Sequence, residues 1–232
     1  EAIKQQQKLI ESDAVLKERI KADVPPLNEE LIIRHAGKAV NTFIKEQIDV
    51  EHSNTLLVAT TTRFNIENQL PGYYNAVVNL KRINNIQRIN KFFETVNEKL
   101  PDRGIFIGSV QTNLLVKKRM LKRYPFLINY LLYTTFFFWK RVIPKLPVTK
   151  NVYFFLTRGR NRALSKAETF GRLYSCGFEV IADRMISDQQ YFVARKIQEP
   201  VFDYNPTYGP LIRLKRVGKG GRTIYVYKMR TM

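Results

Sequence analysis

The sequence contains few of the residues that build disulfides and transition-metal sites. It has one cysteine, Cys176, among its 232 residues, and two histidines, His35 and His52. A single cysteine cannot form an intramolecular disulfide, and this set cannot provide the four ligands of a Cys/His zinc site. No Ser or Cys partner can be inferred for either histidine, which argues against a catalytic Ser–His or Cys–His pair. These absences favour a cytosolic environment and exclude a histidine-rich metalloenzyme.

Acidic residues are also scarce, and one long stretch has none. The chain has 39 Lys and Arg against 20 Asp and Glu, which gives a net charge of +19. No Asp or Glu occurs between Asp102 and Glu168, and residues 117–163 carry 12 basic side chains. Residues 201–232 add 7 basic side chains against 1 acidic one. Such an excess is typical of proteins that bind nucleic acid, anionic lipid or acidic substrates.

An apolar run lies inside the basic stretch. Residues 124–139 contain no charged side chain, and at about 16 residues they are shorter than the roughly 20 that a helix needs to cross a bilayer. We therefore expect interfacial or re-entrant insertion into an anionic membrane surface. The predicted membrane-contacting residues are Phe136, Phe137, Phe138, Trp139, Lys140 and Arg141. A buried core helix is the alternative. RNA binding would require aromatic residues interleaved with basic ones, so we expect no nucleic-acid partner.

The hydrophobic pattern predicts N-terminal helices followed by alternating strands and helices. Residues 1–50 are expected to contain helices at 3–22 and 28–48. The later helices and strands are expected at residues 55–60, 75–80, 86–100, 104–110 and 165–175, with a short apolar element at 152–156. Residues 178–184 and 191–196 are predicted to form a β-hairpin. This order predicts an α/β fold, a mostly parallel Rossmann-like sheet with a C-terminal hairpin.

Residues 55–197 resemble the later half of class I S-adenosylmethionine-dependent methyltransferases. The similar segments are NAVVNL, LPDRGIFIGSV, LSKAETFGRLYSCGFEVI and YFVARK. That family binds its cofactor on a Gly-rich turn after the first strand, whereas the glycines here nowhere form GxGxG. The resemblance implies a methyltransferase-like domain at residues 51–197, without cofactor, that carries a basic and apolar insert at 117–145. A true methyltransferase is the alternative.

The C-terminal segment predicts a further, basic β-hairpin. Apolar alternation at residues 211–215 is followed by a Gly-rich basic turn and by a β-branched and aromatic return strand at 223–227. Its closely spaced cations suit phosphates, because Arg can bind two oxygens at once. A P-loop is excluded, since the glycines lack the GxxxxGK[ST] spacing. A solvated basic hairpin is the alternative.

This segment closely resembles the start of the bacterial sugar transferase family, the polyprenyl-phosphate glycosylphosphotransferases, with the signature GP…RVG…G…IYKFRTM. Gly209-Pro210 matches GP, Arg216-Val217-Gly218 matches RVG, and residues 227–232 match the final run with Met in place of Phe. Members are membrane-associated enzymes that transfer a sugar 1-phosphate from a nucleotide sugar to a polyprenyl phosphate. They start the assembly of capsule, exopolysaccharide or O-glycan.

The resemblance implies a place at the cytoplasmic face of the bacterial inner membrane and a divalent metal such as Mg in the complete enzyme. The predicted phosphate-binding residues are Arg216, Lys219, Arg222, Lys228 and Arg230. Residues 198–207 are expected to be a linker and 208–232 the start of the transferase module. The family's catalytic Asp–Glu pair lies downstream of RTM, so we expect the chain, which begins at Glu1 without Met, to be an inactive fragment. The sugar and the oligomeric state stay open.

Overall fold

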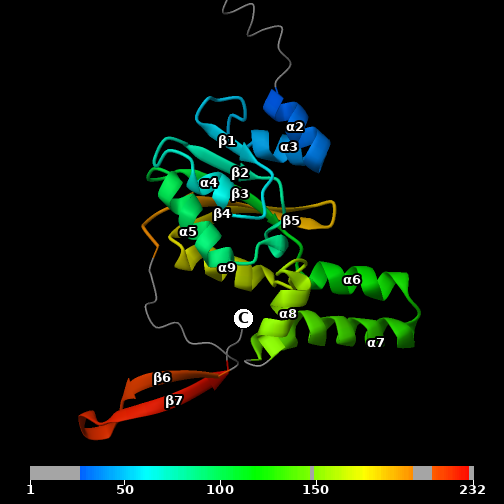
Figure 1. Cartoon of the computed structure of the whole chain (residues 1–232), viewed down its shortest axis with the longest axis vertical. Coiled ribbons are helices and arrows are strands. Elements are labelled where there is room, and N and C mark those ends of the chain that lie inside the picture. Colours follow the sequence, from blue (N-terminus) through cyan, green and yellow to red (C-terminus); the bar gives the residue numbers. More distant parts are fainter. Residues whose placement is uncertain (1–26, 147–148, 201–210, 230–232) are drawn as a thin grey trace, which may run out of the picture. The chain divides into compact units, whose positions relative to one another are not determined.

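The computed structural model of the chain describes residues 27–146, 149–200 and 211–229 (Figure 1). The chain divides into two compact units, the first ending at Ser53 and the second beginning at Asn54. The helix predicted at residues 3–22 and most of the predicted linker, residues 198–207, lie outside the described residues.

The first unit contains two short helices where the pattern predicted a single one at residues 28–48. Helix α2 spans Leu27–Ala36 and helix α3 spans Lys38–Lys45. Gly37 between them has a φ of 92°. Glycine adopts this left-handed backbone without steric cost, so the first helix ends there and the chain changes direction.

The second unit is built on a five-stranded mixed sheet. Its strands are β1 (Thr55–Val58), β2 (Ala76–Asn79), β3 (Ile105–Val110), β4 (Phe178–Ile186) and β5 (Gln189–Lys196). Their order is β1-β2-β3-β5-β4; the first three are parallel, and β5 is antiparallel to both of its neighbours. The predicted Rossmann-like α/β sheet with a C-terminal hairpin is confirmed. Ser187 and Asp188 both have positive φ, as a two-residue hairpin turn requires.

Three helices pack against this sheet around one hydrophobic core. They are α4 (Phe64–Glu67), α5 (Ile89–Lys99) and α9 (Lys166–Ser175). In Figure 1, α5 and α9 lie side by side, and they contact each other. Phe106 on β3 lies at the centre of the core. Its ring centroid is 5.6 to 6.3 Å from those of Phe92, Phe93, Phe178 and Phe192.

The predicted start of α9 is confirmed in detail. The Oγ of Ser165 accepts a hydrogen bond from the backbone N–H of Glu168 at 3.0 Å, which caps the helix. Gly177, with a φ of 81°, follows the helix end. A Cβ there would lie 2.1 Å from the carbonyl oxygen of Gln198, so only glycine fits this turn.

A helical insert connects β3 to α9. It contains α6 (Asn113–Arg123), α7 (Phe126–Phe137), a π-helical turn (Phe138–Val142), a 3-10 turn (Ile143–Lys145) and α8 (Thr149–Thr157). The short apolar element predicted at residues 152–156 is part of α8. Helices α6 and α7 pack as a pair that we call the α6–α7 lobe (Figure 1).

Most of α7 is exposed to solvent. Asn129 is its one buried residue, and the Nδ2 of this amide donates to the carbonyl oxygens of Leu121 and Tyr124, both at 3.2 Å. These bonds fasten α7 to the end of α6. The alternative that residues 124–139 form a buried core helix is therefore wrong. Within the described ranges, no helix is long and apolar enough to span a membrane.

The predicted C-terminal hairpin is confirmed. Strands β6 (Leu211–Val217) and β7 (Thr223–Met229) pair antiparallel around a turn at Lys219–Gly221. Gly220 and Gly221 both have positive φ, which explains the glycines in this turn.

Candidate anion-binding surfaces

The carboxyl edge of the parallel strands, where open α/β sheets usually bind ligands, is filled by the protein's own polar side chains. Buried Asn79 at the end of β2 accepts hydrogen bonds from the backbone N–H of Thr60 and of Lys81, both at 3.1 Å. Its Nδ2 donates to the carbonyl oxygen of Thr60 at 3.0 Å. The order β1-β2-β3 also contains no reversal that would open a crevice.

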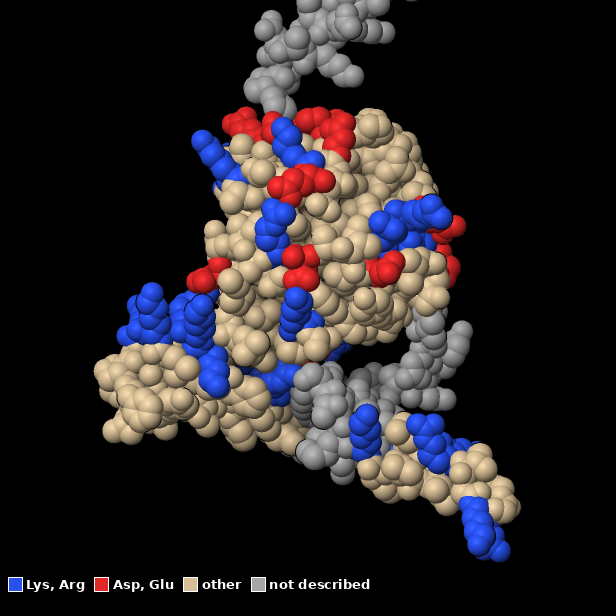
Figure 2. Space-filling view, turned by 180° about the vertical axis from the view of Figure 1, so that it is seen from behind, with Lys and Arg blue, Asp and Glu red and all other residues tan. Residues whose placement is uncertain are grey.

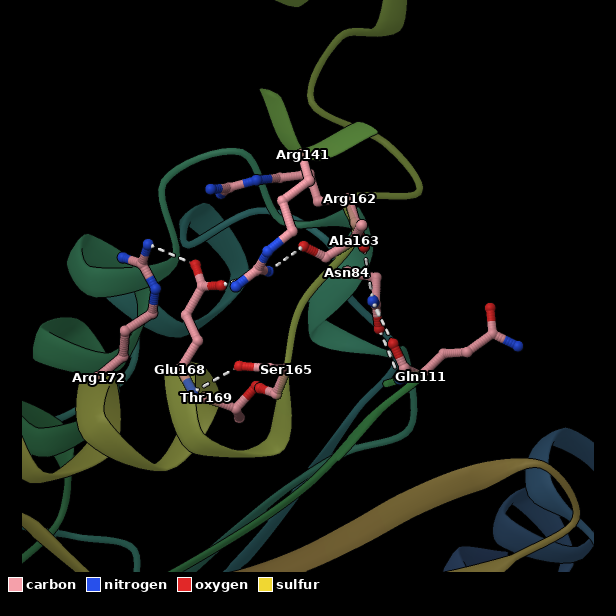
Figure 3. A network of polar contacts seen from close by, with 9 residues as sticks. All are labelled: Asn84, Gln111, Arg141, Arg162, Ala163, Ser165, Glu168, Thr169 and Arg172. Carbon is pink, nitrogen blue, oxygen red and sulfur yellow. Dashed lines mark hydrogen bonds and ion pairs between the residues drawn. The ribbon is translucent and has the colours of Figure 1, made fainter. Parts of the chain in front are cut away.

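The end of β3 is closed in the same way (Figure 3). The Nδ2 of Asn84 donates to the carbonyl oxygens of Gln111 and Arg162, both at 2.8 Å, and its Oδ1 accepts from the Gln111 N–H at 2.7 Å. Arg82 donates to Gln111 Oε1 at 2.8 Å and to Asn161 Oδ1 at 2.9 Å. These bonds fasten the loop after α8 to the edge of the sheet.

A buried carboxylate surrounded by arginines lies at the base of the insert (Figure 3). The side chain of Glu168 is 5% exposed and accepts hydrogen bonds from Arg141 and Arg172, both at 3.0 Å. Burial raises the pKa of Glu168, but the charges of Arg172, Arg141 and Arg162 outweigh it, so this pKa lies below its ordinary value. The ionised carboxylate joins the insert to α9, and we assign it a structural role.

Residues close in the sequence to Arg141 and Arg162 form an open hollow of about 510 Å³. It is lined by Lys140, Leu156, Thr157, Arg158, Arg160 and Asn161. Three of these side chains are cationic and none is acidic. We call this site the basic hollow. Burial lowers the pKa of Lys140, as expected for a cation partly removed from water. This site was not predicted, although Arg158, Arg160 and Arg162 alternate in the sequence and the first two of them line the hollow.

The predicted phosphate-binding residues of the hairpin lie at two places. Arg216 pairs with Ile224, and Lys228 pairs with Ile212, so Arg216 and Lys228 share one face of the hairpin. They are four residues apart along the ladder, about 13 Å at the usual rise of a strand. The two cations therefore face different atoms of a ligand or of a surface.

The remaining predicted cations lie at the turn or outside the described residues. Lys219 belongs to the turn and Arg222 directly follows it, both exposed, and Arg230 falls outside the described residues. The opposite face of the hairpin carries Arg213, whose guanidinium lies 3.5 Å from the ring centroid of Tyr225. This pair was missed, although the two-residue alternation of the strands places both residues on one face.

The predicted membrane-contacting residues extend from the end of α7 into the turn that follows. Phe138 and Trp139 are exposed, and the Trp139 ring also packs on Tyr153 at 6.2 Å between centroids. Lys140 lines the basic hollow, and Arg141 is bound to Glu168. Among the six predicted membrane-contacting residues, Arg141 thus forms an ion pair within the protein.

The most exposed apolar side chains of α7 lie in its first half. Phe126, Leu127 and Leu131 are 74%, 81% and 70% exposed. Figure 2 shows the lobe with the basic side chains of α6 along one edge and an uncharged surface over α7. The cations are Lys117, Lys118, Arg119, Lys122 and Arg123. An apolar surface bordered by cations is the arrangement that binds anionic lipid interfaces.

Neither an activated cysteine nor a cluster of metal ligands occurs in the described part of the chain. Cys176 is buried, and burial raises the pKa of its thiol to about 11, so it is protonated at neutral pH. The described residues contain no group of three or more His, Cys, Asp or Glu that could hold a metal ion. Neither a protein-family model nor a curated protein matches the sequence.

Proposed function

We propose that the chain is the N-terminal portion of a membrane-associated bacterial sugar transferase, which transfers a sugar 1-phosphate from a nucleotide sugar to a polyprenyl phosphate. The β6–β7 hairpin carries this proposal. Of the residues that match the transferase signature, Arg216-Val217 and residues 227–229 belong to a regular antiparallel pair of strands, and Arg216 and Lys228 stand on one exposed face. Arg and Lys on such a face bind phosphate oxygens through charge-assisted hydrogen bonds.

The same face of the hairpin also offers apolar contacts. Leu214, Ile224 and Val226 lie on this face between the two cations, and Ile224 and Val226 are exposed. A two-stranded hairpin alone is only marginally stable in water, so a partner on this face would stabilise it. A polyprenyl phosphate supplies both chemistries, an apolar chain and a phosphate. The cations would neutralise the phosphates that phosphoryl transfer brings together.

The α6–α7 lobe supports membrane association at the cytoplasmic face of the inner membrane. Its exposed apolar residues lie beside the α6 cations, and no acidic residue occurs between Asp102 and Glu168 to repel anionic lipid. The α/β unit serves as a docking unit without cofactor. Among the residues described, no group of three or more His, Cys, Asp or Glu could hold the divalent metal that the resemblance implies.

The hairpin assignment is tested with vesicles of zwitterionic lipid that contain polyprenyl phosphate. The double variant Arg216→Gln, Lys228→Gln is expected to bind them at least tenfold more weakly, because each lost charge-assisted hydrogen bond contributes about 1.5–3 kcal/mol. Co-sedimentation measures the affinity. The control Arg34→Gln, Lys38→Gln removes the same charge from exposed positions on α2 and α3. Equal losses in both variants, or none in the hairpin variant, would refute the assignment.

A second experiment separates this proposal from the methyltransferase alternative. We expect no heat of binding when the chain is titrated with S-adenosylmethionine, because Asn79 uses its amide to join β1 to β2 where a cofactor would approach. Micromolar binding would contradict the cofactor-free assignment. Tight binding of RNA that weakens steeply with salt would instead favour a basic module for nucleic acid.

A further inference from the structure

The loop that carries two arginines of the basic hollow has a tightly fixed backbone. Arg158, Gly159 and Asn161 have φ values of 50°, 72° and 53°. The N–H of Arg158 donates to the carbonyl oxygen of Phe154 at 2.9 Å, and the Arg160 N–H donates to that of Thr157 at 3.0 Å. The backbone of this loop is thus held by its own hydrogen bonds, and a ligand would meet its side chains.

The same loop is anchored to a distant part of the chain. The N–H of Asn161 donates to Asn85 Oδ1 at 3.0 Å, and Arg82 donates to Asn161 Oδ1 at 2.9 Å. Gly159 lies so close to Gln87 that a Cβ on it would be 2.9 Å from the Gln87 Cβ. The backbone that carries the two arginines is therefore already ordered, which reduces the entropy lost when they bind a ligand.

The cations of the hollow have no counterion within the described part of the chain. Arg158 and Arg160 are exposed, and neither side chain makes an ion pair or a hydrogen bond with another described residue. The Nζ of Lys140 lies 5.9 Å from the ring centroid of Tyr153. Glu168, the buried carboxylate nearby in the sequence, is bound to other arginines. Three cations without an acid attract a multiply charged anion.

We propose that the basic hollow is a second phosphate-binding site, formed by Lys140, Arg158 and Arg160. Guanidinium groups bind phosphate oxygens in pairs, and an ammonium group adds a point charge. Asn161 uses its Oδ1 for Arg82, which leaves its Nδ2 as a further donor. The volume of about 510 Å³ exceeds what a phosphate alone fills, and Leu156 supplies an apolar wall for the group that carries it. No residue of the hairpin takes part, so the site stands or falls separately.

The phosphate has two possible sources, a lipid headgroup and a water-soluble molecule, and one experiment distinguishes them. The complete 232-residue chain is titrated with inorganic pyrophosphate by calorimetry, and in parallel it is sedimented with zwitterionic vesicles with and without phosphatidic acid. The variant is Arg158→Gln, Arg160→Gln. The matched control is again Arg34→Gln, Lys38→Gln, and thermal melting checks that all chains are folded.

The arginine variant is expected to bind pyrophosphate, phosphatidic acid vesicles or both at least tenfold more weakly, while the control binds as the unsubstituted chain does. Loss in the pyrophosphate arm identifies a soluble source, and loss in the vesicle arm alone identifies a lipid source. Unchanged binding in both arms, absence of binding by the unsubstituted chain, or an equal loss in the control would overturn the proposal.

Discussion

Replacing Glu168 with alanine is expected to destabilise the α/β unit by about 3–5 kcal/mol, as is usual when one partner of a buried ion pair is removed. The side chains of Arg141 and Arg172 are only 10% and 24% exposed, and both lose their carboxylate. The charge of Arg162 adds to the repulsion that remains, since it also acts on Glu168. Urea unfolding followed by circular dichroism measures the free energy of unfolding.

Glu98→Ala is the matched control, because this acid is exposed on the neighbouring helix α5. We expect it to change stability by no more than about 0.5 kcal/mol, as for most surface substitutions. A loss for Glu168→Ala as small as that of Glu98→Ala would show that the ion pairs do not hold the insert to α9.

The same ion pairs make stability depend on pH. The folded-state pKa of Glu168 lies below its ordinary value of 4.5, so the unfolded chain binds a proton more readily at this residue. The stabilisation is therefore complete above pH 4.5 and is lost as the pH falls through the folded-state pKa. Comparison with Glu168→Gln at neutral and acidic pH should show a stability difference that shrinks in acid.

Replacing Phe126, Leu127 and Leu131 with serine is expected to abolish binding to anionic vesicles. Each of these side chains would contribute about 1.5–3 kcal/mol when it leaves water for lipid, so the triple variant should lose more than a hundredfold in affinity. Their exposure in the folded protein means that the substitutions remove no core contact. Co-sedimentation with vesicles of anionic and of zwitterionic lipid measures the loss.

The chain offers a closely matched control for this variant. Leu27, Phe64 and Leu70 are 63%, 65% and 67% exposed and lie outside the insert, and the triple serine variant at these positions should keep full vesicle binding. The four aromatic residues 136–139 form a second test, with melting as a check because Trp139 packs on Tyr153. Unchanged binding after both sets of substitutions would exclude insertion by this lobe.

Local sequence patterns predicted most of the sheet and both hairpins. Alternation of apolar residues marks strands directly, and Ser165 three residues before Glu168 marks the start of α9. The break at Gly37 was not predicted, because a glycine inside a helical pattern can be either tolerated or used as an end. The sequence did not decide whether α7 is buried or exposed, because an apolar run is compatible with a protein core and with a lipid surface.

The basic hollow could not be predicted from spacing alone. Lys140 and Arg158 are 18 residues apart in the sequence, and helix α8 lies between them. The loop is fixed by Asn85, 76 residues away from Asn161. Likewise, the sequence identifies Glu168 as a capping-box acid, but its partner Arg141 lies 27 residues upstream. Contacts at such separations depend on the finished fold.

The two attachments of the insert determine which edge of the sheet would face a bilayer. Thr112, the N-cap residue of helix α6, lies directly beyond the carboxyl end of β3 and forms a bridge with Leu164 just before α9. Arg141 is also bound to Glu168 on α9, so the insert is attached to the α/β unit at two places. A bilayer that holds the lobe would therefore meet the carboxyl edge of the sheet, the edge that Asn79 and Asn84 close.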